Sequence, residues 1–81
     1  MAGMMRVGDT VYYRGGWGSD APKPAVVEAI DLCDRPREKY GEDVQAAPWE
    51  MKEYVCVSLD DGHWAYGQDV YQTMKEAEIG R

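Results

Sequence analysis

Apolar and polar residues alternate along several short stretches of the chain, and no stretch keeps the 3.6-residue period of an amphipathic helix. The clearest alternation spans residues 53–60, where Val55, Val57 and Leu59 share one face. A second alternation spans residues 7–14 and begins with a Gly-Asp turn. Strands with one buried and one exposed face show this pattern, so both stretches are predicted to be strands of an antiparallel sheet.

Three more strands are expected from shorter signals. Residues 25–31 are apolar without clean alternation, which indicates a β-bulge near Glu28 or burial on both faces. Residues 63–67 follow an Asp-Gly dipeptide, which is typical of hairpin turns. Residues 70–73 follow a tight turn, and we expect them to form a short last strand.

The remaining stretches are rich in turn-forming or charged residues. Residues 15–24 contain several Gly and Pro and are predicted to form a loop. Residues 33–49 are polar and mixed in charge, and a short helical turn over 37–40 is compatible with them. A loop of this length in a small domain is often functional. We expect residues 1–6 to be a flexible N-terminus and residues 74–81 to be a tail or a short helix.

These elements share a pattern of small and β-branched residues with a known class of fold. The residues that carry the pattern are Gly8-Asp9-x-Val11, Ala25-x-Val27-x-x-Ile30 and Val55-x-Val57-x-Leu59-Asp60-Asp61-Gly62. Over residues 7–73 the chain resembles the SH3-like barrels, the class that includes Tudor domains. The resemblance implies an all-β, five-stranded SH3-like antiparallel barrel with a long loop before the third strand. The acidic, Tyr-rich first loop of signalling SH3 domains is absent, which argues against binding of proline-rich peptides.

The chain has 81 residues, which suits a single domain, and its 15 Asp and Glu against 9 Lys and Arg give a net charge of −6. Such an acid excess argues against bulk nucleic-acid binding. No apolar run approaches the roughly 20 residues of a membrane span, and the N-terminus lacks the apolar segment of a signal peptide. We therefore expect a cytoplasmic protein without a membrane partner, and the two cysteines fit a reducing compartment.

The sequence offers little for metal binding or catalysis. It has one His and two Cys that lie far apart, so no metal-ligand spacing exists, and we expect no metal and no cofactor. Cys56 and His63 fall on neighbouring predicted strands, but a thiol in a strand core is usually inert. Cys33 lies at a loop edge with no clear activating group nearby. We therefore expect the protein not to be an enzyme.

Aromatic usage is the most informative feature of the composition. The chain has 3 Trp and 6 Tyr but no Phe, and rings with a polar group favour partly wet positions and interfaces. Trp17 lies on a Gly-rich loop between Arg14 and Lys23, which favours a contact role, whereas Trp64 favours the core. If the loops meet at one end of a barrel, one groove is expected to be lined by Trp17, Tyr40, Trp49, Tyr66, Gln68 and Tyr71.

The first functional hypothesis is a non-catalytic binding module for a nucleotide-like small molecule. The expected site combines stacking rings, loop N–H groups, cations and a residue that recognises a base edge. Its members are Arg14, Gly15, Gly16, Trp17, Gly18, Lys23, Trp49, Tyr66 and Gln68. The chain also resembles, in size and style, short proteins encoded by phages, which implies sequestration of a host signalling nucleotide. A small barrel would share such a site between subunits of a homo-oligomer.

Two alternatives remain open. In one, the acidic chain is a protein-interaction module or inhibitor, of the DNA-mimic or anti-defence type, that docks on a host protein. The acidic residues are scattered and interrupted by basic ones, so mimicry of DNA is its weaker form. In the other, an aromatic cage captures a methylated cation, as in Tudor domains.

Overall fold

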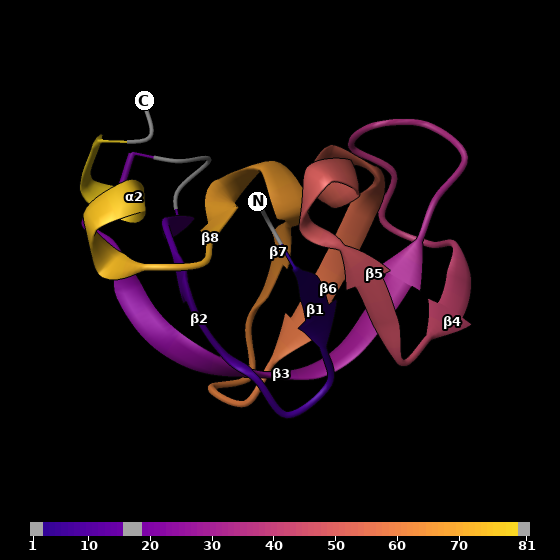
Figure 1. The fold of residues 1–81 in the computed structure, drawn as a ribbon, viewed down its shortest axis with the longest axis horizontal. Helices are drawn as coiled ribbons and strands as arrows, with labels where there is room; N and C mark the ends of the chain where they lie inside the picture. The colour runs from indigo at the N-terminus through magenta and orange to yellow at the C-terminus, as the bar shows by residue number, and fades with distance from the viewer. Residues whose placement is uncertain (1–2, 16–18, 80–81) are drawn as a thin grey trace.

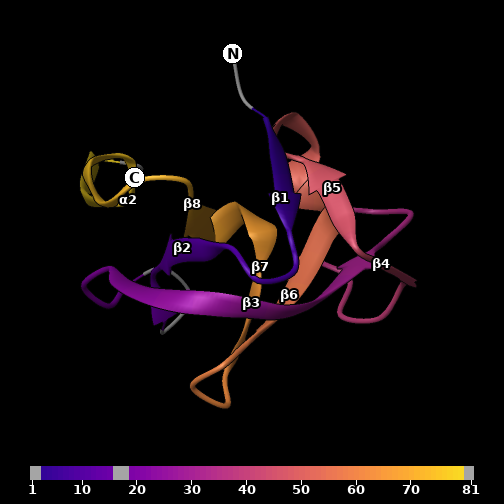
Figure 2. The same cartoon turned by 60° about the horizontal axis from the view of Figure 1, so that its bottom comes forward.

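Strand β3 (Lys23–Leu32) is the longest element and curves across the whole molecule (Figure 1). The structure is a computed structural model that describes residues 3–15 and 19–79. Strand β2 (Thr10–Tyr13) pairs with the first part of β3, and β6 (Val55–Leu59) pairs with its second part. Both pairings are antiparallel, and the curvature of β3 in Figure 1 gives the sheet the form of a half-barrel. Figure 2 shows β2 beside one end of β3 and β6 toward its other end.

The last part of the chain completes this sheet. Strand β7 (Trp64–Tyr66) pairs with β6, and after the 3₁₀-helix η2 (Gly67–Asp69) strand β8 (Val70–Tyr71) pairs with β2. The strand order is therefore β7-β6-β3-β2-β8, and β4 (Glu42–Val44) also pairs with β3. Helix α2 (Met74–Ile79) follows β8, and no helix in the described ranges has the length and apolarity to span a bilayer.

A separate two-stranded sheet lies outside the expected elements. Strand β1 (Met4–Arg6) pairs with β5 (Ala46–Pro48), and the 3₁₀-helix η1 (Trp49–Tyr54) links β5 to β6. The described residues thus form eight strands rather than five. The expected flexible N-terminus contributes a strand, and the expected long loop contains β4 and β5. Strands of three residues are too short to show alternation in the sequence, so whether they form depends on pairing with distant parts of the chain.

Of the two alternatives for residues 25–31, a β-bulge near Glu28 or burial on both faces, the pairing of β3 with β6 supports the bulge. Val27 lies opposite Leu59, and Ala29 lies opposite Ser58, so β3 advances two residues while β6 advances one. The extra residue allows Val27 and Ile30 to face the core although they are three positions apart. Bulges also increase twist and bending, which allows one strand to curve from β2 toward β6.

The core contains mostly aliphatic side chains, with the thioether of Met5, the phenol ring of Tyr13 and one indole, but no Phe. Trp49 is 7% exposed and belongs to the main cluster of buried residues. The side chains with almost no exposure come from β1, β2, β3, β6 and β8, and they are Met5, Val11, Val27, Ile30, Val55, Val57, Leu59 and Val70. Each of these strands therefore contributes at least one side chain to a shared interior.

Gly67 lies where the two 3₁₀-helices approach each other, and a Cβ there would collide with the carbonyl oxygen of Lys52 and with Val55. We predict that Gly67→Ala lowers the free energy of unfolding by about 2–3 kcal/mol, because backbone must shift to make room. Gly3→Ala is the control, since no atom lies within 4 Å of its added methyl group. Urea unfolding of the two variants checks this, and equal midpoints would contradict the predicted collision.

Candidate functional site

A small hollow opens where the start of β3 meets the turn between β6 and β7. Its volume is about 190 Å³. Its lining combines two aromatic rings, a lysine, a histidine, a carboxylate and a glycine, namely Tyr13, Gly15, Asp20, Lys23, His63 and Trp64. We refer to it as the Trp64 hollow. The N–H of Asp20 donates to the carbonyl oxygen of Gly15 at 3.1 Å, so these two lining residues are bonded to each other.

Trp64 lies on the outer face of the sheet because of its register. In β7 it pairs with the exposed Ser58, whereas its neighbour Ala65 pairs with Val57 in the core. The indole is 41% exposed and packs edge-on against Tyr66, with ring centroids 5.1 Å apart. The ammonium of Lys39 lies 4.7 Å from the indole centroid, which is a cation–π distance. Trp64 is therefore an exposed ring with a cation already beside it.

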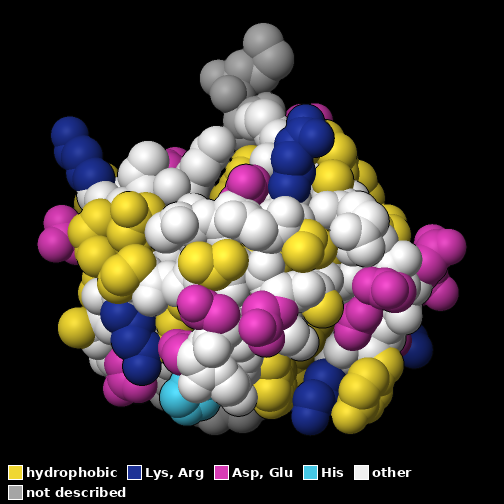
Figure 3. All heavy atoms as spheres, turned by 90° about the horizontal axis from the view of Figure 1, so that it is seen from below, with side chains coloured by type: hydrophobic (Ala, Val, Ile, Leu, Met, Phe, Trp, Pro, Cys, Tyr) yellow, Lys and Arg dark blue, Asp and Glu magenta, His cyan; other side chains and the backbone are white. Residues whose placement is uncertain are grey.

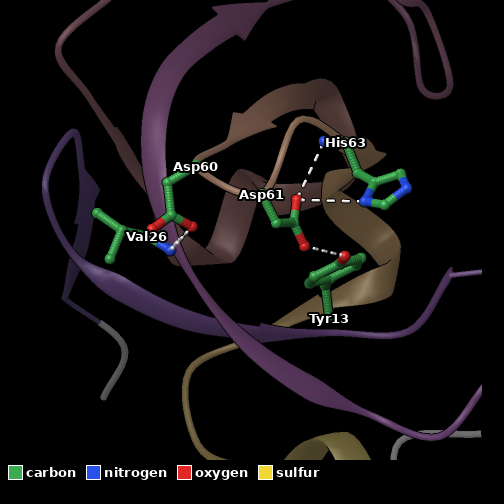
Figure 4. A network of polar contacts seen from close by, with 5 residues as sticks. All are labelled: Tyr13, Val26, Asp60, Asp61 and His63. Atoms are coloured by element: carbon green, nitrogen blue, oxygen red, sulfur yellow. Dashed lines mark hydrogen bonds and ion pairs between the residues drawn. The ribbon is translucent and has the colours of Figure 1, made fainter.

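A polar network fixes the other wall of the Trp64 hollow (Figure 4). The hydroxyl of Tyr13 donates to one oxygen of Asp61 at 2.5 Å. The other oxygen of Asp61 accepts the backbone N–H of His63 at 3.0 Å and lies 3.3 Å from the His63 Nδ1. On the same turn Asp60 accepts the backbone N–H of Val26 at 3.0 Å. Two consecutive carboxylates thus attach the β6–β7 turn to β2 and β3.

Burial and this network shift two pKa values in opposite directions. Burial, followed by the bond to Asp61, raises the pKa of Tyr13 to about 12. The same hydroxyl lowers the pKa of Asp61, because a donated hydrogen bond favours the charged carboxylate. The ammonium of Lys23 lies 5.3 Å from the Tyr13 centroid, on the side of the hollow. The hollow therefore presents an ammonium, an imidazole and one carboxylate around an aromatic wall.

Some of the residues predicted for the site do lie together. Gly15 and Lys23 both line the Trp64 hollow, and Tyr66 contacts the indole that forms its wall. Gly16, Trp17 and Gly18 lie outside the described residues. Trp64 and Tyr66 are two positions apart on β7, and their ring contact places them on the same face of the strand.

Other predicted site residues lie elsewhere. Arg14 donates from Nη1 to the carbonyl oxygen of Ala77 at 2.7 Å, so its guanidinium holds α2. Trp49 is buried in the core and does not line a groove. Gln68 accepts a hydrogen bond from the Nε of Arg37 at 3.0 Å. The expected single groove is therefore not formed by these residues.

Trp64, for which the sequence favoured the core, and Trp49, which was included among the predicted site residues, both differ from these expectations. Trp64 is exposed and Trp49 is core, because β5 and η1 replace an expected loop and direct Trp49 inward. The sequence analysis also missed Tyr13, His63 and Asp20 as members of a site. The sequence did contain one signal for the exposure of Trp64. The alternation in β6 places Ser58 on the outer face, and the residue that pairs with Ser58 on β7 must lie on the same face.

A second and larger hollow lies between the end of β3 and η1, with a volume of about 550 Å³. Three carboxylates, two phenol rings and a thioether line much of it, from Asp34, Glu38, Glu42, Tyr40, Tyr54 and Met51. We refer to it as the acidic hollow. On the face shown in Figure 3, several acidic side chains lie close together near the centre, and the Lys and Arg side chains lie mostly toward the edges. Tyr71 lies apart from both hollows, with the ammonium of Lys52 3.9 Å from its ring centroid.

Both thiols are buried. Burial raises the pKa of Cys56 to about 11 and also raises the pKa of Cys33. Cys56 and His63 do not lie opposite each other on the paired strands. Cys56 pairs with Tyr66, whereas the carbonyl oxygen of His63 accepts the N–H of Leu59. Within residues 3–15 and 19–79, no group of three or more His, Cys, Asp and Glu side chains is arranged to hold a metal ion.

Comparison with known proteins adds no relative to this description. No protein-family model, no curated protein and no solved structure matches the chain. The functional argument therefore depends on the residues and their geometry.

The hydrogen bond from Tyr13 to Asp61 makes stability depend on pH. We predict that Tyr13→Phe lowers the free energy of unfolding at neutral pH by about 1 kcal/mol. Because the pKa of Asp61 is lowered on folding, its stabilisation is complete above the ordinary value of 3.8 and is lost as pH falls through the folded-state pKa. The difference between wild type and variant should therefore shrink in acid. Urea unfolding across this pH range measures it.

Tyr12→Phe is the matched control for this prediction, since Tyr12 is its neighbour on β2 and its hydroxyl makes no bond to Asp61. It should leave the acid dependence of wild type unchanged. A Tyr13→Phe difference that stays constant down to the lowest pH would contradict the assignment of the bond to a charged Asp61.

Proposed function

We propose that the protein is a non-catalytic binding module that holds a nucleotide-like small molecule at the Trp64 hollow. The observation that carries the proposal is the exposed indole of Trp64, which lines a hollow together with Lys23 and lies 4.7 Å from the ammonium of Lys39. An exposed ring with one cation beside it and another in the same hollow suits a planar ligand that carries negative charge. No residue of this hollow is assigned a catalytic role.

The proposal includes an SH3-like identity for the half-barrel. Strand order supports it, because β8 returns to pair with β2 after the single 3₁₀ turn η2. The meander from β2 through β3 and β6 to β7 also fits this topology. Strands β1, β4 and β5 are then additions to a five-stranded barrel. In small barrels the loops carry the variable chemistry, which fits a hollow built from a loop and a turn.

The lining residues suggest a role for each part of such a ligand. The Trp64 indole offers a stacking surface for a base, and stacking is tolerant of base identity. Asp20 offers a carboxylate acceptor for an exocyclic amino group. Lys23 and Lys39 offer ammonium groups for a phosphate. The residues therefore match a base with an attached phosphate better than either group alone.

The size of the hollow limits the ligand. At about 190 Å³ it is smaller than the roughly 300 Å³ at which ordinary small-molecule sites begin. One planar ring system fits that space, so the remainder of a nucleotide would lie on the surface. A second subunit that covers this surface would bury more of the ligand, so the proposal includes a homo-oligomer.

Native mass spectrometry of the protein purified from its expression host tests the proposal first. Spectra before and after denaturation give the oligomeric state and any retained small molecule together. A discrete additional mass that is released on unfolding supports the proposal and identifies the compound. Absence of a retained mass, together with no binding of any common nucleoside monophosphate by calorimetry, would overturn it.

We predict that Trp64→Ala weakens binding of AMP, the nucleotide probe, by about tenfold or more, because base–aromatic stacking contributes about 1–3 kcal/mol. Stability should fall by only about 1 kcal/mol, since the ring is partly exposed and its main loss is the contact with Tyr66. Isothermal titration calorimetry and urea unfolding measure the two effects. Trp64→Phe should restore most of the affinity.

Lysine variants separate the phosphate from the base. Lys23→Gln should weaken AMP and leave the affinity for adenosine unchanged, because adenosine has no phosphate. Lys75→Gln is the matched control, since Lys75 is an exposed lysine on α2 that does not line the hollow. Equal loss of AMP affinity in both variants would show a general charge effect and contradict a role for Lys23.

A further inference from the structure

The acidic hollow is independent of the Trp64 hollow in its lining and is nearly three times larger, at about 550 Å³ against about 190 Å³. Tyr40 lines the acidic hollow, and the neighbouring Lys39 lies over the indole of Trp64. The lining of the acidic hollow holds the carboxylates of Asp34, Glu38 and Glu42 and, among the described residues, no lysine or arginine.

Backbone contacts hold this hollow open. The N–H of Cys33 donates to the carbonyl oxygen of Tyr54 at 2.7 Å, which attaches the end of β3 to the end of η1. The thiol of Cys33 donates to the carbonyl oxygen of Glu38 at 3.1 Å. Gly41 passes so close to the Leu32 carbonyl oxygen that a Cβ would collide with it. A preformed site loses less conformational entropy when a ligand binds.

One of the two rings of the hollow is largely exposed. Tyr40 is 78% exposed, the largest exposure of any large hydrophobic side chain in the described chain. The ammonium of Lys39 lies 5.5 Å from its ring centroid, within the range of a cation–π contact. The chain itself therefore already places a cation on this ring. Tyrosine is also enriched where proteins bind one another.

The carboxylates have weak partners. Glu38 pairs with Arg35 at 3.1 Å, but Arg35 is 81% exposed, and such surface pairs contribute little to stability. A ligand cation can replace Arg35 at low cost. The occupant of this hollow should therefore be positively charged and able to contact aromatic faces and carboxylates together.

Three classes of cation can be compared with this lining. A divalent metal is disfavoured, because within residues 3–15 and 19–79 no group of three or more His, Cys, Asp and Glu side chains is arranged to hold a metal ion. A quaternary ammonium has no N–H groups and would leave three carboxylates without donors. A guanidinium is planar, stacks on aromatic rings and donates up to five N–H groups in a fork that matches carboxylates.

We propose that the acidic hollow binds an unmodified arginine side chain in a basic segment of a partner protein. The volume exceeds that of one guanidinium, so residues beside the arginine also enter the hollow. The net charge of −6 attracts a basic partner and speeds association. This proposal does not depend on ligand binding at the Trp64 hollow.

An NMR titration of ¹⁵N-labelled protein tests it with four synthetic peptides that differ at one central residue: arginine, citrulline, lysine or trimethyl-lysine. The arginine peptide should shift amide signals of residues 32–42 and 51–54. Citrulline has the same shape without the charge, so its peptide should bind at least tenfold more weakly. Equal binding of the citrulline peptide, tighter binding of the trimethyl-lysine peptide, or no shifts in these segments would overturn the proposal.

Variants locate the binding. Tyr40→Ala should weaken the arginine peptide by about tenfold, and its high exposure means that the variant folds. Glu42→Gln should weaken it several-fold. Glu78→Gln is the matched control, since it removes the same charge from the exposed face of α2. If Glu78→Gln weakens binding as much as Glu42→Gln, only general charge attraction is present and the proposal fails.

Trp64→Ala distinguishes this proposal from the proposed function. It should abolish stacking of a nucleotide and leave the arginine peptide unaffected, because Trp64 does not line the acidic hollow. Tyr40→Ala should have the opposite effect. Loss of peptide binding in Trp64→Ala with retention in Tyr40→Ala would assign the peptide to the other hollow and overturn the proposal.

Discussion

The bulge at Glu28 is the constraint on which the rest of the structure depends. It lets β3 pair with β2 at one end and with both β4 and β6 at the other. Without the extra residue, Val27 and Ile30 would face opposite sides, and one of them would leave the core. A single strand can then organise a half-barrel in a chain of 81 residues. Strand β3 thereby places both hollows, since one borders its start and the other borders its end.

Polar groups near the two hollows fix the loops rather than the sheet. Asp60 and Asp61 attach the β6–β7 turn to β3 and β2 through Val26 and Tyr13. Cys33 attaches the end of β3 to η1 through its N–H group. Hydrogen bonds of this kind contribute modestly to stability but are costly to leave unmade. These polar groups therefore hold the loops in position. Removing one of them would change the shape of a hollow more than it would change the sheet.

The sequence predicted the main sheet well and the additional strands poorly. Alternation located β6, the Asp-Gly turn located β7, and irregular apolar spacing located the bulge, because each signal arises from local backbone chemistry. Strands β1 and β5 have three residues each, and they pair with each other although Met5 and its partner Ala47 are far apart in the sequence. No local sequence pattern indicates such a pairing. The expected loop at residues 33–49 therefore concealed two strands.

The site was predicted in part, for a similar reason. Gly15 and Lys23 are near each other in sequence, and the loop that joins them could be recognised. The exposure of Trp64 depends on which residue of β6 it faces, and the burial of Trp49 depends on η1. The composition indicated that Tyr and Trp side chains would contribute to a site. Which of these side chains are exposed depends on the pairing register of the strands. Contacts between segments distant in sequence, such as Tyr13 with Asp61, left no trace in local patterns.

The burial of both cysteines has a practical consequence for labelling. With a pKa of about 11, Cys56 is a thiolate in roughly one molecule in ten thousand at pH 7. The pKa of Cys33 is also raised, and its thiol is turned toward backbone oxygens. Maleimides react with the thiolate, so a cysteine introduced on the exposed surface would be modified far faster than either native one. The protein can therefore carry a single fluorophore or spin label at a chosen position without removal of its own thiols.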